Sequence, residues 1–296
     1  MSKTPSWEAL LAEFLLHLKA AGRAKRTLDD YTYQVKRFFR AHPDAWPDRL
    51  KEACLAYFGA LADESVAPTT YNLARQNLRA FFNWCVEEGI LEASPIGKLP
   101  KRRQEPKIRY IEEEVIRELL AVIAQDTFAG LRSYALILLQ LDTGVRPGEA
   151  LQLLPEHFDF SQHQVLIPAT AAKTRFSRVL PIYIETEKAV KRLLKARHPS
   201  WPPTTPVFCS FSGRPLSVDD WGHILKEDSK KIGRRIRPYD LRHTFAIMFL
   251  RNGGNVFALQ QMLGHTTLAM TQYYVSLAER DIKDQHQLAS PIARLL

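Results

Sequence analysis

The chain has 296 residues, of which 46% are hydrophobic and 25% are charged. This balance is typical of folded globular proteins and excludes an intrinsically disordered chain. Lysine and arginine number 41 against 32 acidic residues, so the formal net charge is +9 and a polyanionic partner is expected.

The cysteines and the apolar segments indicate the compartment. The 3 cysteines, Cys54, Cys85 and Cys209, have no paired spacing, which argues against a disulfide framework or a structural zinc site and fits a reducing cytoplasm. Residues 1–22 mix charged with apolar side chains and lack a cleavage-site pattern. No stretch approaches the roughly 18 consecutive apolar residues that span a bilayer. A cytoplasmic protein is therefore expected.

The first part of the chain, residues 1–97, predicts a domain of four helices. Apolar side chains recur at helical spacing over 7–18, 28–39, 50–61 and 73–85. Thr27 and Thr69 are expected to cap the second and fourth helices, and Gly22 and Gly89 are expected to end the first and the fourth.

Residues 98–108 are expected to form a basic linker. Prolines interrupt this segment and most of its side chains are cationic or polar, so it neither continues a helix nor builds a core. The candidates for contacts with a DNA backbone are Lys101, Arg102, Arg103 and Lys107. A solvated loop with incidental charge is the alternative.

The remainder, residues 109–296, predicts helices around a small sheet. The apolar spacing predicts helices over 112–126, 131–143, 187–198, 218–231 and 239–251, followed by two or three short helices. Alternating patterns predict short hairpin strands over 158–160, 164–168 and 178–184. The whole chain is thus expected to be mainly α with a small β-sheet.

Two segments place basic residues at turns. Arg146 follows the expected end of a helix, and the carboxylate of Glu149 can orient it. Lys173 is expected at a hairpin tip with Arg175 and Arg178 on the same ribbon, a shape that fits a DNA groove. Each of these residues alone is more often a solvated surface side chain, so neither segment by itself indicates a function.

Two later segments supply Arg242, His265 and Tyr274. With Arg146 and Lys173 they offer two guanidinium groups for phosphate oxygens, an ammonium group, an imidazole and a phenol. No phosphate-binding glycine loop, paired-carboxylate metal motif or Gly-x-Ser-x-Gly elbow accompanies them. The set suits phosphoryl transfer without a metal, in which arginines neutralise the phosphorane, lysine protonates the leaving oxygen and tyrosine attacks.

In this order and spacing, the motifs resemble those of the tyrosine recombinases of the phage integrase family. The sequence reads Thr-Gly-x-Arg-x-x-Glu at 143–149, Leu-Arg-His-Thr-Phe-Ala at 241–246 and Leu-Gly-His at 263–265, with Tyr274 nine residues after that histidine. The resemblance implies a SAM-like four-helix core-binding domain, a linker and an α+β catalytic domain, in the short Xer-like type without an arm-binding domain.

The resemblance also implies an activity and a role for each motif residue. The activity is site-specific DNA recombination through a 3′-phosphotyrosyl intermediate and a Holliday junction, with no ATP, metal or other cofactor. The implied roles are the following: Arg146 and Arg242 clamp the scissile phosphate, Lys173 protonates the departing 5′ oxygen, His265 bonds the phosphate or relays a proton, Glu149 supports the arginines, and Tyr274 attacks. The protein would act on double-stranded DNA as a homotetramer, with residues 279–296 exchanged between protomers.

Three positions qualify this resemblance. The family usually has His-x-x-Arg, but Tyr239 stands three residues before Arg242, and a neutral phenol can orient a phosphate without adding charge. His243 is not expected to replace the missing histidine, because adjacent helical residues point about 100° apart, and it is interpreted as a packed structural histidine. Tyr273 is expected to pack against the core, since the family spacing selects Tyr274.

Two other functions stay open. A DNA-binding regulator with a decayed active site would account for the missing histidine. A topoisomerase-like or telomere-resolving enzyme would use similar chemistry, and strand exchange between two duplexes distinguishes a recombinase from it.

Overall fold

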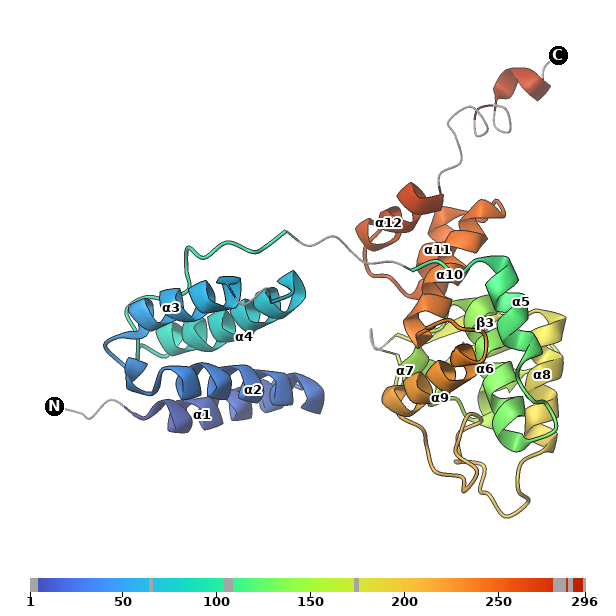
Figure 1. Ribbon diagram of the computed structural model, residues 1–296, viewed down its shortest axis with the longest axis horizontal. Coiled ribbons are helices and arrows are strands. Elements are labelled where there is room, and N and C mark those ends of the chain that lie inside the picture. Colours follow the sequence, from blue (N-terminus) through green and yellow to red (C-terminus); the bar gives the residue numbers. More distant parts are fainter. Residues whose placement is uncertain are drawn as a thin grey trace. The chain divides into compact units, whose positions relative to one another are not determined.

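The computed structural model (Figure 1) describes residues 5–63, 66–103, 109–172, 176–278, 286 and 290–294. The chain divides into two compact units, Met1–Pro106 and Lys107–Leu296. The described part of the first unit is helical, and the second adds a three-stranded sheet, so the prediction of a mainly α fold with a small sheet is confirmed. No helix in the described ranges has the length and apolar character needed to cross a membrane. The exact limits of the linker, 98–108, stay a prediction, because residues 104–108 lie outside the described ranges.

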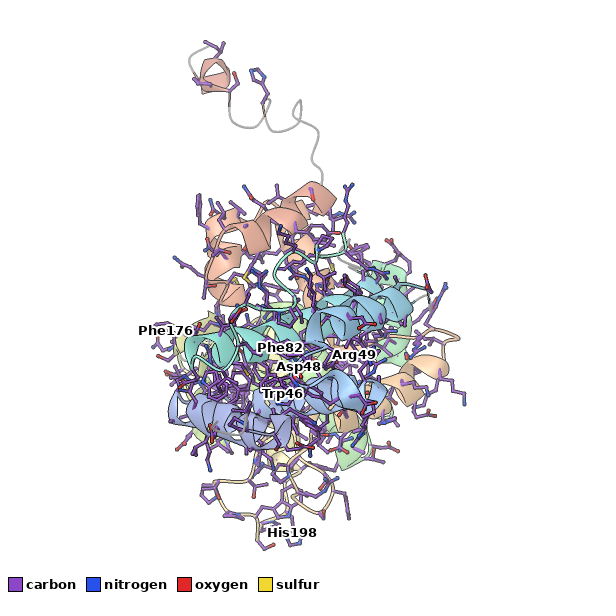
Figure 2. The ribbon with its side chains drawn as sticks, turned by 90° about the vertical axis from the view of Figure 1, so that its left-hand side faces the viewer. Trp46, Asp48, Arg49, Phe82, Phe176 and His198 are labelled. Atoms are coloured by element: carbon purple, nitrogen blue, oxygen red, sulfur yellow. The ribbon has the colours of Figure 1, made fainter. Side chains whose placement is uncertain are left out.

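The helices of the first unit enclose an aromatic core. Their bounds are α1 Trp7–Ala20, α2 Lys25–Ala41, the 3-10 helix η1 Pro43–Ala45, α3 Leu50–Asp63 and α4 Pro68–Glu87. Phe38 and Phe82 are fully buried, with ring centroids 5.8 Å apart, and Phe82 lies among the helices in Figure 2. Edge-to-face aromatic packing of this kind stabilises a small helical core.

Two of the predicted helix starts are wrong. The carbonyl of Ala24 already accepts the N–H of Leu28, so α2 begins at Lys25 and Thr27 lies inside its first turn. Likewise α4 begins at Pro68, one residue before Thr69. Proline suits the first helical position because its φ is already helical and no N–H is lost there. Neither threonine therefore serves as a cap.

The start of the predicted linker is anchored on α4. The Asn72 side chain bonds both the backbone N–H and the carbonyl of Arg102, each at 2.9 Å. Buried Arg75 donates to the carbonyl of Leu99 at 2.6 Å, and the Arg102 guanidinium lies 4.4 Å from the centre of the Tyr71 ring. The segment up to residue 103 thus belongs to the first unit, and Arg102 is half-buried instead of solvated.

The second unit surrounds the sheet with helices. Its elements are α5 Glu113–Ala121, α6 Phe128–Thr143, α7 Pro147–Ala150, η2 Pro155–His157, β1 Phe158–Asp159, β2 Gln164–Ile167, β3 Arg178–Pro181, α8 Ile184–Lys195, α9 Val218–Lys230, α10 Pro238–Arg251, α11 Val256–Leu263, α12 Ala269–Ala278 and η3 Pro291–Arg294. The strands are antiparallel in the order β1-β2-β3, with Val165 opposite Leu180. The third predicted strand ends early, because Asp142 accepts the N–H of Tyr183 at 2.7 Å and α8 begins directly after it.

Helix α6 is the central element of the second unit. Its residues Leu136 and Leu139 are fully buried in the core. From the same helix, Gln140 accepts a hydrogen bond from the indole N–H of Trp221 at 2.8 Å and donates to the carbonyl of Pro238 at 3.4 Å. These buried bonds connect α6 with α9 and with the start of α10. They fix two of the predicted motif segments relative to each other.

Candidate active site

Two helix ends form the base of the site. Helix α6 ends at Gly144 and α11 ends at Gly264, both in the left-handed region with φ of 63° and 60°. A helix end leaves carbonyls without an intrahelical partner. Arg242 donates from Nη1 to the Gly144 carbonyl at 2.6 Å, and Arg146 donates from Nη2 to the Gly264 carbonyl at 3.1 Å. The two glycines of the motifs therefore supply acceptors that position the two arginines.

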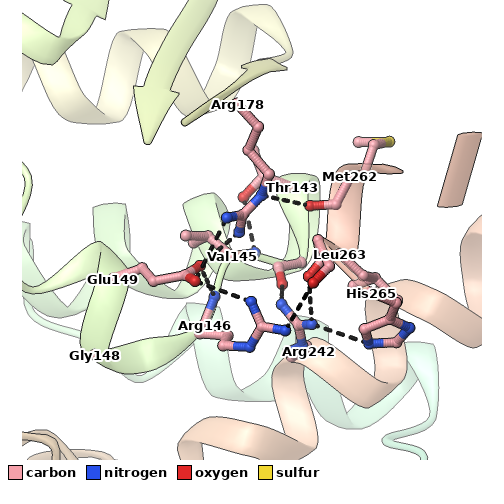
Figure 3. A network of polar contacts seen from close by, with 12 residues as sticks. Thr143, Val145, Arg146, Gly148, Glu149, Arg178, Arg242, Met262, Leu263 and His265 are labelled. Carbon is pink, nitrogen blue, oxygen red and sulfur yellow. Dashed lines mark hydrogen bonds and ion pairs between the residues drawn. The ribbon is translucent and has the colours of Figure 1, made fainter. Parts of the chain in front are cut away.

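Arg242 is the most enclosed cation of the site (Figure 3), with 3% of its surface exposed. Besides Gly144, it contacts the carbonyl of Leu263 at 2.8 Å and Nε2 of His265 at 3.2 Å. Burial, and then the charge of Arg146, lower the pKa of Arg242 to about 10. The group therefore remains a cation at neutral pH, in an orientation set by three acceptors.

Glu149 connects two arginines from different elements. Its carboxylate lies 2.9 Å from Nη1 of Arg146 and 2.5 Å from Nη2 of Arg178, and Arg178 also donates from Nε to the Met262 carbonyl at 3.0 Å. Burial by itself raises the pKa of Glu149, but the hydrogen bonds and charges of Arg178 and Arg146 outweigh it and hold the pKa below its usual value. With Arg242, three cations face one carboxylate, which leaves the site positively charged.

His265 is held as a neutral imidazole. Arg242 can only donate, so Nε2 of His265 accepts, and the proton on Nδ1 is donated to Oγ1 of Thr271 at 2.9 Å. Burial, followed by the nearby arginines, lowers the pKa of His265 to about 4. This ring thus bridges the arginine cluster to the buried hydroxyl at the start of α12.

Tyr274 on α12 lies against this cluster with 5% of its surface exposed. Its ring stacks on that of His265, with centroids 6.3 Å apart and planes at 11°, and its hydroxyl lies 2.7 Å from Nδ1 of His243. Burial raises the pKa of Tyr274, although the charge of Arg242 partly opposes the shift. The neighbouring Tyr273 is half-buried. A protonated phenol is therefore enclosed beside guanidinium groups, an arrangement suited to attack on a phosphate.

Comparison with known proteins shows the family of the chain. A model of the phage integrase family matches residues 109–280, and a model of the phage integrase N-terminal SAM-like domain matches residues 10–91. The chain belongs to the phage integrase family. Tyrosine recombinase XerA of Pyrococcus furiosus is 27% identical over 292 residues, covering 97% of this chain and 96% of that protein.

Solved structures of integrases share the fold. The Tn1549 transposon integrase in complex with transposon right end DNA has a TM-score of 0.76 at 19% identity, covering 95% of this chain and 96% of that one. A lambda integrase tetramer bound to a Holliday junction has a TM-score of 0.75 at 16% identity, covering 92% of this chain and 78% of that one. The predicted combination of a SAM-like domain with an integrase catalytic domain is confirmed.

The residues of the integrase motifs on helix α10 differ from the expectation. Tyr239 is 47% exposed in the first turn, and no hydrogen bond recorded in the described ranges joins it to Arg242 or Tyr274. His243 is not only a packing residue, because its Nδ1 contacts the Tyr274 hydroxyl. Sequence reasoning missed this contact. A signal was present in the spacing, since residue 243 follows residue 239 by four and shares its face of the helix.

The predicted DNA-contacting residues fall into different environments. Lys101 and Arg103 are exposed, whereas Arg102 packs on Tyr71. Arg178 points inward to Glu149 instead of lining the outside of a groove-binding ribbon. Lys107, Lys173 and Arg175 lie outside the described ranges. Phe176, which follows them, is 75% exposed and is labelled in Figure 2.

Proposed function

We propose that the chain is a site-specific DNA recombinase that cuts and rejoins strands through a 3′-phosphotyrosyl intermediate and a Holliday junction. The observation that carries this proposal is the enclosure of Tyr274 beside His265, whose Nε2 accepts from Arg242 at 3.2 Å. The phenol, the imidazole and the guanidinium come from α12, the α11–α12 connection and α10, so the fold converges on one reaction centre. The names of its relatives support the same activity.

In this reaction the arginines stabilise the phosphorane. Arg146 and Arg242 are held by helix-end carbonyls and by Glu149 before DNA arrives, so little reorganisation is needed when charge develops on the phosphate oxygens. The excess of cations over carboxylates suits a doubly charged transition state. Lys173 is the proposed proton donor to the 5′ oxygen. His265 is the proposed hydrogen-bond partner of the phosphate, in the tautomer that carries the proton on Nε2 while Nδ1 accepts from the Thr271 hydroxyl.

The covalent step keeps the energy of the phosphodiester bond. Oη of Tyr274 forms a bond to phosphorus while the bond from phosphorus to the 5′ oxygen breaks. The 5′ oxygen leaves as a hydroxyl, and a 5′ hydroxyl from the partner duplex later displaces the tyrosine. Because one ester replaces another at each step, neither strand cleavage nor religation requires ATP.

The proposed assembly is a homotetramer on double-stranded DNA. The Holliday-junction tetramer of lambda integrase, a protein of the same fold, supports it. The proposed exchange of residues 279–296 between protomers concerns a segment mostly outside the described ranges. Removing residues 290–296 is expected to reduce cooperative assembly on DNA, and unchanged assembly would exclude the exchange. A cytoplasmic location stays a prediction.

The test begins with the target site. A pool of random-sequence duplexes with a nick is incubated with the protein, and DNA that remains attached in SDS is amplified and sequenced. The selected duplex should form an SDS-resistant adduct, and two such duplexes should exchange strands. Specific binding without an adduct would favour a regulator, and relaxation of supercoiled DNA without exchange would favour a topoisomerase-like enzyme.

A further inference from the structure

The nearest polar contact of the Tyr274 hydroxyl in the described ranges is His243, a residue of the Leu-Arg-His-Thr-Phe-Ala motif to which the family resemblance assigns no role. Nδ1 of His243 lies 2.7 Å from Oη of Tyr274, and the ring centroids are 5.7 Å apart with planes at 41°. His243 comes from α10 and Tyr274 from α12, so the contact depends on the packing of these two helices. A distance of 2.7 Å is that of a well-formed hydrogen bond to a hydroxyl.

The protonation state of His243 suits acceptance of a proton. Burial, followed by the charge of Arg242 on the same helix, lowers the pKa of His243 to about 4. The ring is therefore neutral at neutral pH, while burial keeps Tyr274 protonated. Among the described residues, Arg242 on α10 acts on this ring through its charge, and Tyr274 on α12 contacts it directly. A bound phosphate would offset the charge of Arg242 and make a proton on His243 less unfavourable, so the base would strengthen when DNA is in place.

The other candidates for this proton are less suited. Both ring nitrogens of His265 have partners, since Nε2 accepts from Arg242 and Nδ1 donates to Thr271. Tyr239 is 47% exposed, and no hydrogen bond within the described ranges joins it to Tyr274. His243 is thus the described side chain with a ring nitrogen within hydrogen-bond distance of the Tyr274 hydroxyl.

We propose that His243 is a catalytic residue whose Nδ1 accepts the phenolic proton of Tyr274 as Oη bonds to phosphorus. The O–H bond of Tyr274 breaks, an N–H bond forms on His243, and the bond from phosphorus to the 5′ oxygen breaks. On religation the imidazolium returns the proton to the departing tyrosine oxygen, so the ring is unchanged over the cycle. This inference rests on the proposed function, because it requires strand cleavage by Tyr274.

The experiment measures single-turnover cleavage of the selected nicked duplex by the full chain. His243→Asn retains an amide at about the position of Nδ1 but does not titrate, and His243→Gln is the second variant. The matched control is His198→Asn, because His198 is exposed and its side chain contacts the nearby Ser200 and the ring of Trp201. General base catalysis typically contributes 10²–10⁴-fold, so both His243 variants should cleave at least ~100-fold more slowly than the wild type at pH 7.

Two further measurements separate proton transfer from simple placement of the tyrosine. The cleavage deficit of His243→Asn should shrink as pH rises from 7 to 9, because the ionised fraction of the Tyr274 phenol, which needs no base, grows with pH. The deficit should persist on a duplex with sulfur in place of the 5′ bridging oxygen. Sulfur leaves without a proton donor, but the tyrosine must still lose its proton. The wild-type rate should be nearly level between pH 6 and 8.

Several results would overturn the proposal: wild-type rates in both variants, a deficit that is equal at every pH, or a deficit abolished by the sulfur substrate. If either variant fails to fold, a wild-type rate that rises tenfold per pH unit between 6 and 8 would still contradict it. Absence of any adduct with the wild type would instead count against the recombinase function. The two failures are therefore distinguishable.

Discussion

The guanidinium of Arg178 lies 2.5 Å from the carboxylate of Glu149, and this ion pair joins β3 to α7. Both side chains are largely enclosed, with 12% and 2% exposed. The pair fixes the carboxylate that also orients Arg146. The pair therefore anchors the start of β3 to the arginine cluster.

The enclosed carboxylate should affect stability with a defined pH dependence. Glu149→Gln removes the charge shared by Arg146 and Arg178 and is expected to cost about 3 kcal/mol of unfolding free energy at pH 7. The folded pKa lies below the ordinary 4.5, so this stabilisation is present above pH 4.5 and is lost as pH falls through the folded value. The difference in unfolding free energy between wild type and variant should therefore become smaller below pH 4.5. Urea unfolding at several pH values measures it.

The control for this variant is Glu113→Gln. Its carboxylate is 50% exposed and pairs with Arg117 on the surface of α5, so a small and nearly constant effect is expected. If the difference in unfolding free energy between wild type and Glu149→Gln stays the same from pH 7 to pH 4, the carboxylate at this position is not ionised as assigned.

The two arginines should matter for cleavage more than for DNA binding. Arg146→Ala and Arg242→Lys each remove preoriented donors, and loss of one such donor typically costs 10²–10³-fold in rate. Cleavage of the nicked duplex should fall by at least ~100-fold, while binding in gel-shift assays changes only a few-fold. Arg117→Ala, an exposed guanidinium, serves as the control. Cleavage at the control rate by either variant would exclude the assigned role.

Gly144 should tolerate no side chain. Its φ is +63°, and a Cβ there would come within 2.2 Å of the Phe245 ring. Gly144→Ala is expected to cost about 2–4 kcal/mol, from the left-handed backbone and the overpacked contact. Gly222→Ala in α9 meets nothing within 4 Å and should instead stabilise by about 0.5–1 kcal/mol. Thermal unfolding midpoints, measured by calorimetry, should fall for Gly144→Ala and rise for Gly222→Ala. A shift in the same direction for both variants would contradict these predictions.

The three consecutive basic residues at the start of the predicted linker should behave differently. Lys101→Ala and Arg103→Ala remove exposed charges, and each should lower the slope of log K against log salt by about 0.9 if it contacts one phosphate. Arg102→Ala should also lower the thermal midpoint, because it removes the contact with the Tyr71 ring. Equal midpoints for all three variants would show that Arg102 does not stabilise the first unit.

Local signals predicted those features that depend on neighbouring residues. Helix α9 begins at residue 218 as predicted, and Ser217 and Asp220, three residues apart, form a capping box at its start. The prediction of Thr27 as a cap is wrong because α2 begins two residues earlier, at Lys25. The spacing of the motifs indicated which arginines, histidine and tyrosine to examine, and the structure brings them together.

Contacts between distant elements were beyond the reach of spacing. The hydrogen bond between His243 and Tyr274 depends on how α10 packs on α12. The four-residue spacing from Tyr239 to His243 indicates a shared helix face but does not indicate this partner. The inward orientation of Arg178 depends on Glu149 and the Met262 carbonyl being in place. Similarly, the position of Arg102 depends on Asn72, which bonds its backbone, and on Tyr71, whose ring contacts its guanidinium.

The identity of the nucleophile tests the account most directly. The protein is trapped on the selected nicked duplex and digested with nuclease and trypsin, and the peptide that retains a 3′ nucleotide is fragmented by mass spectrometry. The account predicts the nucleotide on Tyr274, with no adduct in Tyr274→Phe and a normal adduct in Tyr273→Phe. A nucleotide on Tyr273, or on any residue other than a tyrosine, would contradict it.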